Sequence, residues 1–206
     1  MVWRGDVRGD GALRADALRA RLFEQGVVLV TGCLDDDLAA RSAAELMTLD
    51  ALCDDAVQLL LNTSGSSYSA AFTLIDVIDL LGVAVHATCI GRAEGPSLGV
   101  LAVAARRSAL LHARLRFAEP DVSYEGYADD VAAQVARHAE DRERFSARLA
   151  EACGRPARWF ADAMAEGRLL DVHEALRMGV IDEVATSRRV PVLVESHRSG
   201  RSDRPV

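Results

Sequence analysis

The chain contains 206 residues, of which 50% are hydrophobic and 5% aromatic, and this length suffices for one domain with a sizeable core. Its formal net charge is -7, and its 24 basic residues, all arginine, are interleaved with acidic residues, which argues against nucleic acid as a partner. No apolar run approaches the ~20 residues of a membrane span, and residues 1–20 lack the apolar core of a signal peptide, so we expect a cytoplasmic protein without a membrane partner.

The amino-terminal half is expected to alternate strands and helices. Short apolar runs predict strands at residues 27–31, 57–61 and 83–90, and apolar residues at helical spacing predict helices at 35–52, 70–81 and 98–105. The polar stretch Asn62–Ser67 is expected to be a loop, and Gly91–Pro96 a turn. This alternation is typical of an α/β domain with a parallel sheet.

After a predicted strand pair within residues 109–117, the pattern becomes mainly helical. Residues 128–153 are charged and amphipathic and end at Gly154, which predicts one long helix. Two shorter helices are expected at 158–166 and 172–178, followed by a strand at 180–184. The end segments, residues 1–17 and 187–206, are expected to be flexible.

The four cysteines stand singly, without a Cys-x-x-Cys pair: Cys33, Cys53, Cys89 and Cys153. In a reducing compartment such residues are expected to be small buried hydrophobic side chains rather than disulfides. His86 and Cys89 have a spacing that metal ligands use, but no second pair accompanies them. We therefore expect neither a metal site nor a cofactor.

Four strings, in order and at matching spacings, carry a resemblance to a known family. They are Val27–Gly32 with the acidic residues after it, Leu59–Ser67, Cys89–Ala93, and Glu174–Ala175 with Met178–Val184. With these strings, residues 18–184 resemble the Clp protease proteolytic subunit, a member of the ClpP/crotonase fold. The resemblance implies an α/β fold with a repeated β-β-α core over residues 18–186 and a long protruding handle helix, the handle region being about 122–153.

The resemblance also implies a nucleophile position, and here two alignments are open. The family cleaves peptides with a serine, a histidine and an aspartate, and backbone N–H groups hold the oxyanion. An alignment that continues from Gly91 without a gap places Gly95 at the nucleophile position and Pro96 at the position of the oxyanion donor. Neither residue can act there, because glycine has no nucleophilic side chain and proline has no backbone N–H. A rival alignment, with two extra residues before this point, makes Ser97 the only candidate nucleophile.

The histidine and aspartate positions do not depend on that choice. Arg114–Pro120 matches the family's Arg-x-x-x-His-Gln-Pro with Ala118 at the histidine, and Gly167 falls at the aspartate. In the loop that binds substrate, Gly65 remains but Ser66 replaces a second glycine. No other histidine is expected to take over: His112 is six residues away along a strand, and His138 and His173 are expected on helix surfaces.

These departures favour a subunit of an ATP-dependent Clp-type complex that is catalytically impaired or inactive, with a structural or regulatory role in a ring of its own copies and an active paralogue. One alternative is an active ATP-dependent serine endopeptidase that uses Ser97; another is a crotonase-type acyl-CoA enzyme, which the long handle-like helix disfavours. Gln58 and Leu60 stand where the family commonly has aromatic residues that help to dock the ATPase, so we expect a Clp ATPase to bind weakly.

Overall fold

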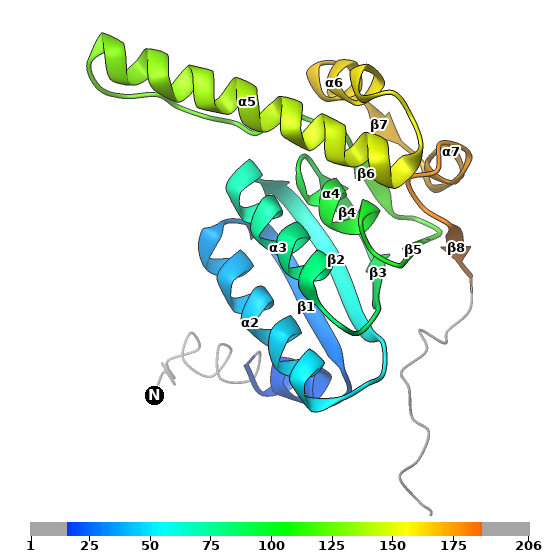
Figure 1. Ribbon diagram of the computed structural model, residues 1–206. Coiled ribbons are helices and arrows are strands. Elements are labelled where there is room, and N and C mark those ends of the chain that lie inside the picture. Colours follow the sequence, from blue (N-terminus) through cyan, green and yellow to red (C-terminus); the bar gives the residue numbers. More distant parts are fainter. Residues whose placement is uncertain (1–15, 187–206) are drawn as a thin grey trace, which may run out of the picture.

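A computed structural model describes residues 16–186, which fold around two β-sheets (Figure 1). The larger sheet has five parallel strands in the order β1-β2-β3-β5-β8. Its strands are β1 Val27–Leu34, β2 Val57–Ser66, β3 Val85–Cys89, β5 Arg106–Leu110 and β8 Glu183–Ala185. The smaller sheet has the strand order β4-β6-β7, in which β6 is parallel to β4 and antiparallel to β7. Its strands are β4 Arg92–Glu94, β6 Arg114–Arg116 and β7 Leu169–Leu170. The α/β class predicted from the sequence is confirmed.

Helices cover the larger sheet and extend beyond it (Figure 1). The bounds are α2 Asp36–Leu52, α3 Tyr68–Leu80, α4 Ser97–Ala102, α5 Ala128–Cys153, α6 Ala157–Ala165 and α7 Val172–Arg177, and a further helix covers residues 16–23. Side-chain caps fix where α2 and α3 begin, because the Asp35 carboxylate accepts from the Leu38 amide at 2.9 Å and the Ser67 hydroxyl from the Ala70 amide at 3.1 Å. Both caps lie directly after strands, at the carboxyl ends of β1 and β2.

The short helix α4 is buried throughout and packs against α3 and α5. Gly99 makes this close approach possible, because a Cβ at this position would overlap the ring of Phe145 on α5 and lie 3.0 Å from Ile75 on α3. Phe145 itself has no exposed surface. The packing of α4 therefore fixes the position of the turn that precedes it, residues 95–96.

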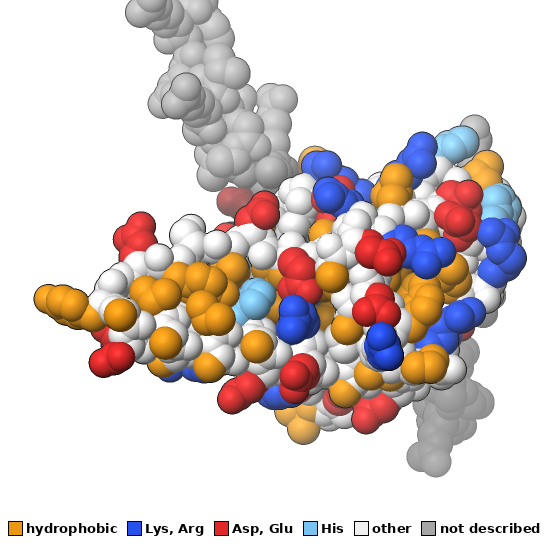
Figure 2. All heavy atoms as spheres, turned by 90° about the horizontal axis from the view of Figure 1, so that it is seen from above, with side chains coloured by type: hydrophobic (Ala, Val, Ile, Leu, Met, Phe, Trp, Pro, Cys, Tyr) orange, Lys and Arg blue, Asp and Glu red, His pale blue; other side chains and the backbone are white. Residues whose placement is uncertain are grey.

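The long helix α5 has the bounds predicted from the sequence, Ala128–Cys153. It ends at Gly154, whose φ of 65° is the left-handed conformation that glycine adopts most easily. Its buried residues all lie in its carboxyl-terminal half: Phe145, Ser146 and Leu149. The amino-terminal half projects from the body (Figure 1), and hydrophobic side chains gather along it (Figure 2). Among the exposed ones there are Tyr127 and Val135.

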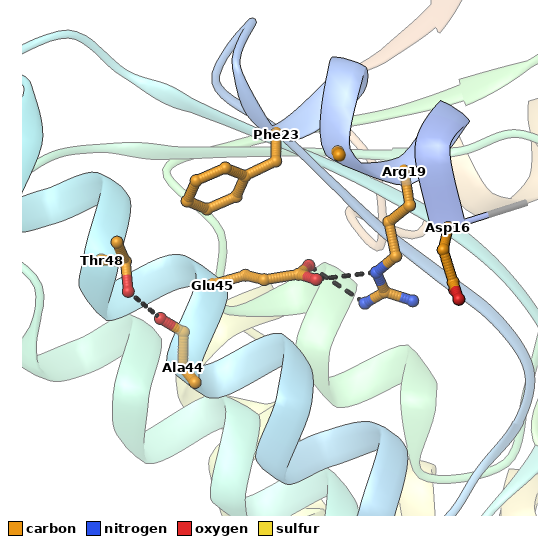
Figure 3. Close-up of a pocket in the computed structure, with 7 residues that line it drawn as sticks. Asp16, Arg19, Phe23, Ala44, Glu45 and Thr48 are labelled. Carbon is orange, nitrogen blue, oxygen red and sulfur yellow. Dashed lines mark hydrogen bonds and ion pairs between the residues drawn. The ribbon is translucent and has the colours of Figure 1, made fainter. Parts of the chain in front are cut away.

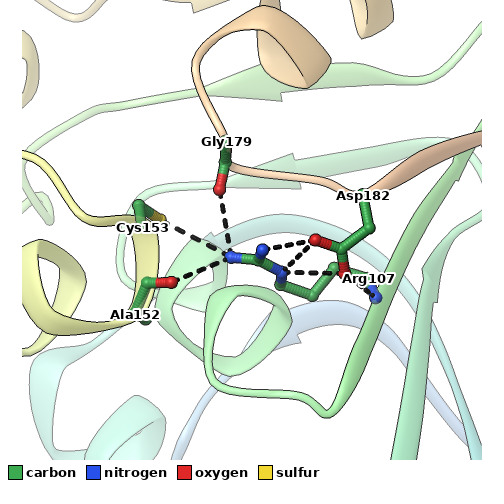
Figure 4. Close-up of polar contacts among 5 residues, drawn as sticks. All are labelled: Arg107, Ala152, Cys153, Gly179 and Asp182. Carbon is green, nitrogen blue, oxygen red and sulfur yellow. Dashed lines mark hydrogen bonds and ion pairs between the residues drawn. The ribbon is translucent and has the colours of Figure 1, made fainter.

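Arg107 on β5 ties three distant parts of the chain together (Figure 4). Its guanidinium forms an ion pair with Asp182 and donates to the backbone carbonyls of Ala152, at 3.1 Å, and Gly179, at 3.0 Å. The backbone amide of Arg107 also donates to the Asp182 carboxylate at 2.9 Å. This arginine therefore fastens the end of α5 and the turn before β8 to the sheet.

The structure corrects several predicted boundaries. Asn62–Ser66, expected to be a loop, continues β2 and pairs with residues 31–34 of β1 across a bulge at Gly32 and Cys33. The polar side chains misled the prediction, because parallel pairing needs only the backbone and the end of a strand does not have to be apolar. Gly91–Pro96, expected to be a turn, contains β4. The last strand begins at Glu183 instead of residue 180.

The cysteines are free, as expected, but they are not all buried. Cys89 is buried and its pKa is raised to about 11 by burial, so its thiol is neutral at physiological pH. Cys53 and Cys153 are partly buried, and Cys33 is exposed, against the expectation, because it lies at the bulge in β1 near the end of the strand. Within residues 16–186, no helix is both long and apolar enough to cross a bilayer. Most of residues 1–17 and all of 187–206, the segments expected to be flexible, lie outside the described part.

Candidate active site

A cleft of about 570 Å³ opens at the carboxyl ends of β1 and β2, where the smaller sheet meets them. Ligand sites of α/β proteins commonly lie at this edge of the sheet. Its walls come from the ends of β1 and β2 with the helix starts that follow them, from the end of β4, and from β6 with the segment after it. The lining residues are Cys33–Asp36, Ser64–Ser67, Ser69, Glu94, Gly95, Arg116 and Ala118–Val122.

The smaller sheet brings the three positions singled out for catalysis to one end of its strands. Gly95 directly follows β4, and Ala118 comes two residues after the end of β6. Gly167 lies two residues before β7, and because β7 runs antiparallel to β6, its start lies beside the end of β6. The amide of Phe117 donates to the carbonyl of Arg168 at 2.8 Å, which holds these two stretches together.

Gly95 and Ala118 are neighbours. A Cβ on Gly95 would lie 3.2 Å from the carbonyl oxygen of Ala118, and the amide of Gly95 donates to the carbonyl of Arg116 at 2.9 Å. Gly95 has a φ of 66°, so the backbone turns sharply between β4 and α4. Both residues line the cleft, where one offers a hydrogen atom and the other a methyl group.

Two polar side chains fix the backbone around this turn. Gly91 must lack a side chain, because its Cβ would lie 2.6 Å from the Asn62 carboxamide oxygen, which accepts from the amide of Arg92 at 3.2 Å. The hydroxyl of Ser66 donates to the carbonyl of Glu94 at 3.1 Å and accepts from the amide of Ser97 at 2.7 Å. Ser66, expected at a position where the backbone approaches the substrate, thus also clamps the turn from both sides.

Ser97 lies beneath the cleft rather than in its wall. It is the first residue of α4, it has no exposed surface, and it is absent from the lining. Its hydroxyl lies 2.6 Å from that of Thr63 and donates to the carbonyl of Glu94 at 2.9 Å. Pro96, which precedes it, is buried and has no amide hydrogen to offer to an oxyanion. Neither His112 nor His173 is part of the cleft lining; these two histidines are separate from the site.

Gly167 is separated from the cleft by an arginine. A Cβ on Gly167 would lie 3.4 Å from a guanidinium nitrogen of Arg116, and Arg116 lines the cleft while Gly167 does not. Arg116 is the only basic side chain in the lining, against five carboxylates: Asp35, Asp36, Glu94, Glu119 and Asp121. The cleft therefore carries a negative charge.

Sequence reasoning missed a cluster beside Ala118. The hydroxyl of Tyr68 donates to the Glu119 carboxylate at 3.0 Å, and His138 on α5 lies 3.7 Å from the same carboxylate oxygen. Burial, and next the charge of Glu119, raise the pKa of Tyr68, so the phenol keeps its proton and acts as a donor. His138 was expected on a helix surface, and its ring packs at a tilt against that of Tyr68, with 5.3 Å between the ring centroids. Only the fold reveals this contact, since the three residues are far apart in the sequence.

The predicted docking position lies on β2, away from the cleft. Gln58 is buried, and its side-chain nitrogen lies 3.4 Å from a ring nitrogen of His86 on β3. Burial lowers the pKa of this histidine, which favours the neutral ring. Leu60 is partly buried on the same strand. The amide of Gln58 therefore already has a partner within the sheet.

A second hollow of about 360 Å³ lies between the helix at residues 16–23 and α2 (Figure 3). Phe23 and Ala44 give it an apolar wall, and Arg19 forms an ion pair with Glu45 at 2.7 Å across it. No nucleophile or base lies there with a partner suited to catalysis. Among residues 16–186, no group of three or more His, Cys, Asp or Glu side chains could hold a metal ion.

One comparison with known proteins bears on this geometry. A family model with the description Clp protease matches residues 9–188, well over half of the chain. The match includes every residue of the cleft and the whole of α5.

Proposed function

The chain belongs to the Clp protease family, and we propose that within this family it is a ring subunit that does not cleave peptide bonds and instead has a structural or regulatory role. The family assembles into oligomeric rings, which supports self-association. The proposed partners are further copies of this chain and an active paralogue. A Clp ATPase is proposed to bind rings of this chain alone only weakly.

The observation that carries the proposal is the pair Gly95 and Ala118 at the cleft. A serine peptidase needs a nucleophile within hydrogen-bond reach of its base. These two positions are neighbours, with 3.2 Å between the Cβ position of residue 95 and the carbonyl oxygen of residue 118, yet neither carries a side chain that exchanges protons. Their proximity supports the alignment without a gap, in which they are the nucleophile and base positions.

The geometry of Ser97 speaks against the alternative of an active enzyme. Its hydroxyl is buried and lies within hydrogen-bond distance of Thr63 and the carbonyl of Glu94, so it has no contact with the cleft and no base beside it. A nucleophile must reach the substrate carbonyl, and this hydroxyl would first have to break both contacts. The surroundings of Ser97 are those of a structural serine at the start of a helix.

Association through α5 is supported by the exposed apolar side chains on its projecting half and at the residue before it. Val135 is 47% exposed and Tyr127 86% exposed in the single chain, whereas Leu149 is already buried by the chain's own core. A surface stripe of this kind commonly marks a contact with another protein. Two such stripes, from two rings, could cover each other.

The test is a restoration experiment on the full-length protein. The unmodified chain should neither hydrolyse short fluorogenic peptides nor react with a fluorophosphonate probe. The variant with Gly95→Ser, Pro96→Met and Ala118→His, with Gly167→Asp added, should gain labelling at residue 95. The matched control carries Gly95→Ala in place of Gly95→Ser, together with the other three changes, and it should stay unlabelled. Stoichiometric labelling of the unmodified chain at Ser97, located by peptide mapping, would refute the proposal.

A further inference from the structure

The segment between β6 and α5, residues 118–126 and here termed the strap, is held by few hydrogen bonds. Within residues 16–186, none of its backbone amides or carbonyls pairs with another backbone group. Side chains form hydrogen bonds with two of its residues: the Tyr68 hydroxyl donates to the Glu119 carboxylate at 3.0 Å, and the Gln134 carboxamide donates to the Glu125 carbonyl at 3.2 Å. Hydrogen bonds therefore fasten the strap at two points.

The strap forms a wall that two hollows share. One is the cleft, and the other, here termed the α5 hollow, has a volume of about 370 Å³ and lies between the strap, the start of α3 and α5. Four residues line both hollows, two of them in the strap: Pro120 and Val122, with Ser67 and Ser69. Movement of the strap would therefore join the cleft to the α5 hollow.

The first fastening point connects the strap to a side chain that cannot move with it. The ring of Tyr68 is 4% exposed and packs against the fully buried Phe145, with 5.4 Å between the ring centroids. Burial raises the pKa of Tyr68, so the phenol keeps the proton that it donates to Glu119. The core thus fixes the donor, whereas the acceptor belongs to the strap.

The fastened position of Glu119 also carries a cost. Its second carboxylate oxygen, Oε1, is buried and has no hydrogen-bond partner among the described residues. A buried acceptor without a donor raises the free energy of the state that buries it, and water would satisfy this oxygen once the strap moved away. The hydrogen bond to Oε2 favours the fastened position while the unpaired Oε1 opposes it, which keeps the difference in free energy between the two positions small.

We propose that the strap opens when Glu119 leaves Tyr68, and that opening joins the cleft to the α5 hollow. This proposal rests on the function proposed above and deepens it, because it places a conformational control on the cleft of a ring subunit that does not cleave peptides. Tyr124 reports the movement, since it lies on the strap, lines the α5 hollow and meets the His138 ring edge-on at 6.3 Å between centroids.

The experiment is limited proteolysis of the full-length protein with chymotrypsin, which cuts after aromatic residues. Mass spectrometry follows the cut after Tyr124, which requires the strap to leave α5. Tyr68→Phe removes the hydroxyl donor but keeps the ring, and we expect this cut to become about tenfold faster. Glu119→Ala should accelerate it equally. The double variant should be no faster than either single variant, because both changes remove the same contact.

The matched control is Asp121→Ala, which removes another carboxylate of the strap. Within the described part of the chain Asp121 forms no ion pair or side-chain hydrogen bond, so its variant should be cut after Tyr124 at the rate of the unmodified chain. The cut after Phe145, which has no exposed surface, monitors unfolding of the whole domain and should keep its rate in every variant.

Three outcomes would overturn the proposal: an unchanged cut after Tyr124 in Tyr68→Phe, effects of Tyr68→Phe and Glu119→Ala that multiply in the double variant, or equal acceleration at Tyr124 and Phe145. None of these measurements depends on peptidase activity of the chain itself. Hydrolysis of a fluorogenic peptide by the unmodified chain would refute the proposed function alone, and the proteolysis rates would refute the strap alone.

Discussion

Replacement of Arg107 by methionine should destabilise the fold through loss of one guanidinium. Methionine keeps an unbranched apolar stem but removes the contacts to Asp182 and to the carbonyls of Ala152 and Gly179. These contacts hold the end of α5 and the turn before β8 against β5, and Arg107 itself is only 16% exposed at its side chain. The free energy of unfolding should therefore fall, although the cleft is elsewhere.

The magnitude follows from the contacts. Two hydrogen bonds to carbonyls contribute about 1 kcal/mol each, and the charge-assisted pair with Asp182 about 1 kcal/mol after allowance for solvent, because the Asp182 side chain is 42% exposed. We expect a loss of about 3 kcal/mol, which for a protein of this size lowers the melting temperature by roughly 10 °C.

The pH dependence gives an independent check. Arg107 lowers the pKa of Asp182, because its guanidinium donates hydrogen bonds to the ionised carboxylate. A carboxyl group whose folded pKa lies below its unfolded value of 3.8 contributes full stability above that value. This contribution is lost as the pH falls through the folded pKa, so the deficit of the variant should shrink on acidification below pH 4.

The assay is urea unfolding followed by circular dichroism at pH 7 and pH 3.5. Arg106→Met is the matched control, since Arg106 lies on the same strand and pairs with Glu183, but both side chains are about half exposed. The Arg106→Met variant should lose less than about 1 kcal/mol of its free energy of unfolding. If the two variants had equal stability at pH 7, the reasoning about the Arg107 contacts would be wrong.

Three further outcomes are expected. Gly99→Ala should lower the free energy of unfolding in urea by about 3 kcal/mol, because the new methyl group would overlap the ring of Phe145. In the control Gly82→Ala, the nearest atom to the new methyl group would lie 3.6 Å away, and the free energy of unfolding should change by less than about 1 kcal/mol. Val135→Asp should shift the oligomer to a smaller species in size-exclusion chromatography with light scattering, and a monomeric unmodified chain would contradict this. Gln58→Tyr should strengthen binding of a Clp ATPase to the homo-oligomer, and tight binding unchanged by the substitution would contradict the weak-docking interpretation.

Local patterns determined most of the secondary structure. Apolar spacing and the closing Gly154 predicted α5 to the residue, because a helix cap and a 3.6-residue period are properties of neighbouring residues. The helix predicted at residues 35–52 likewise matches α2, which begins at Asp36 after the cap Asp35. In the site, counting along the chain predicted Gly95, Ala118 and Gly167 at the nucleophile, histidine and aspartate positions, and these assignments stay predictions.

Only the tertiary structure decided how these residues meet. Gly95 lines the cleft and Ser97 lies beneath it. This placement is set by the packing of Gly99 under Phe145 and by the hydrogen bonds of Ser66, and neither contact leaves a periodic signal in the sequence. The charge of the cleft is likewise a sum over five carboxylates from separate segments. Such contacts join residues distant in sequence, and a single sequence carries no physical trace of a distance between segments that the fold brings together.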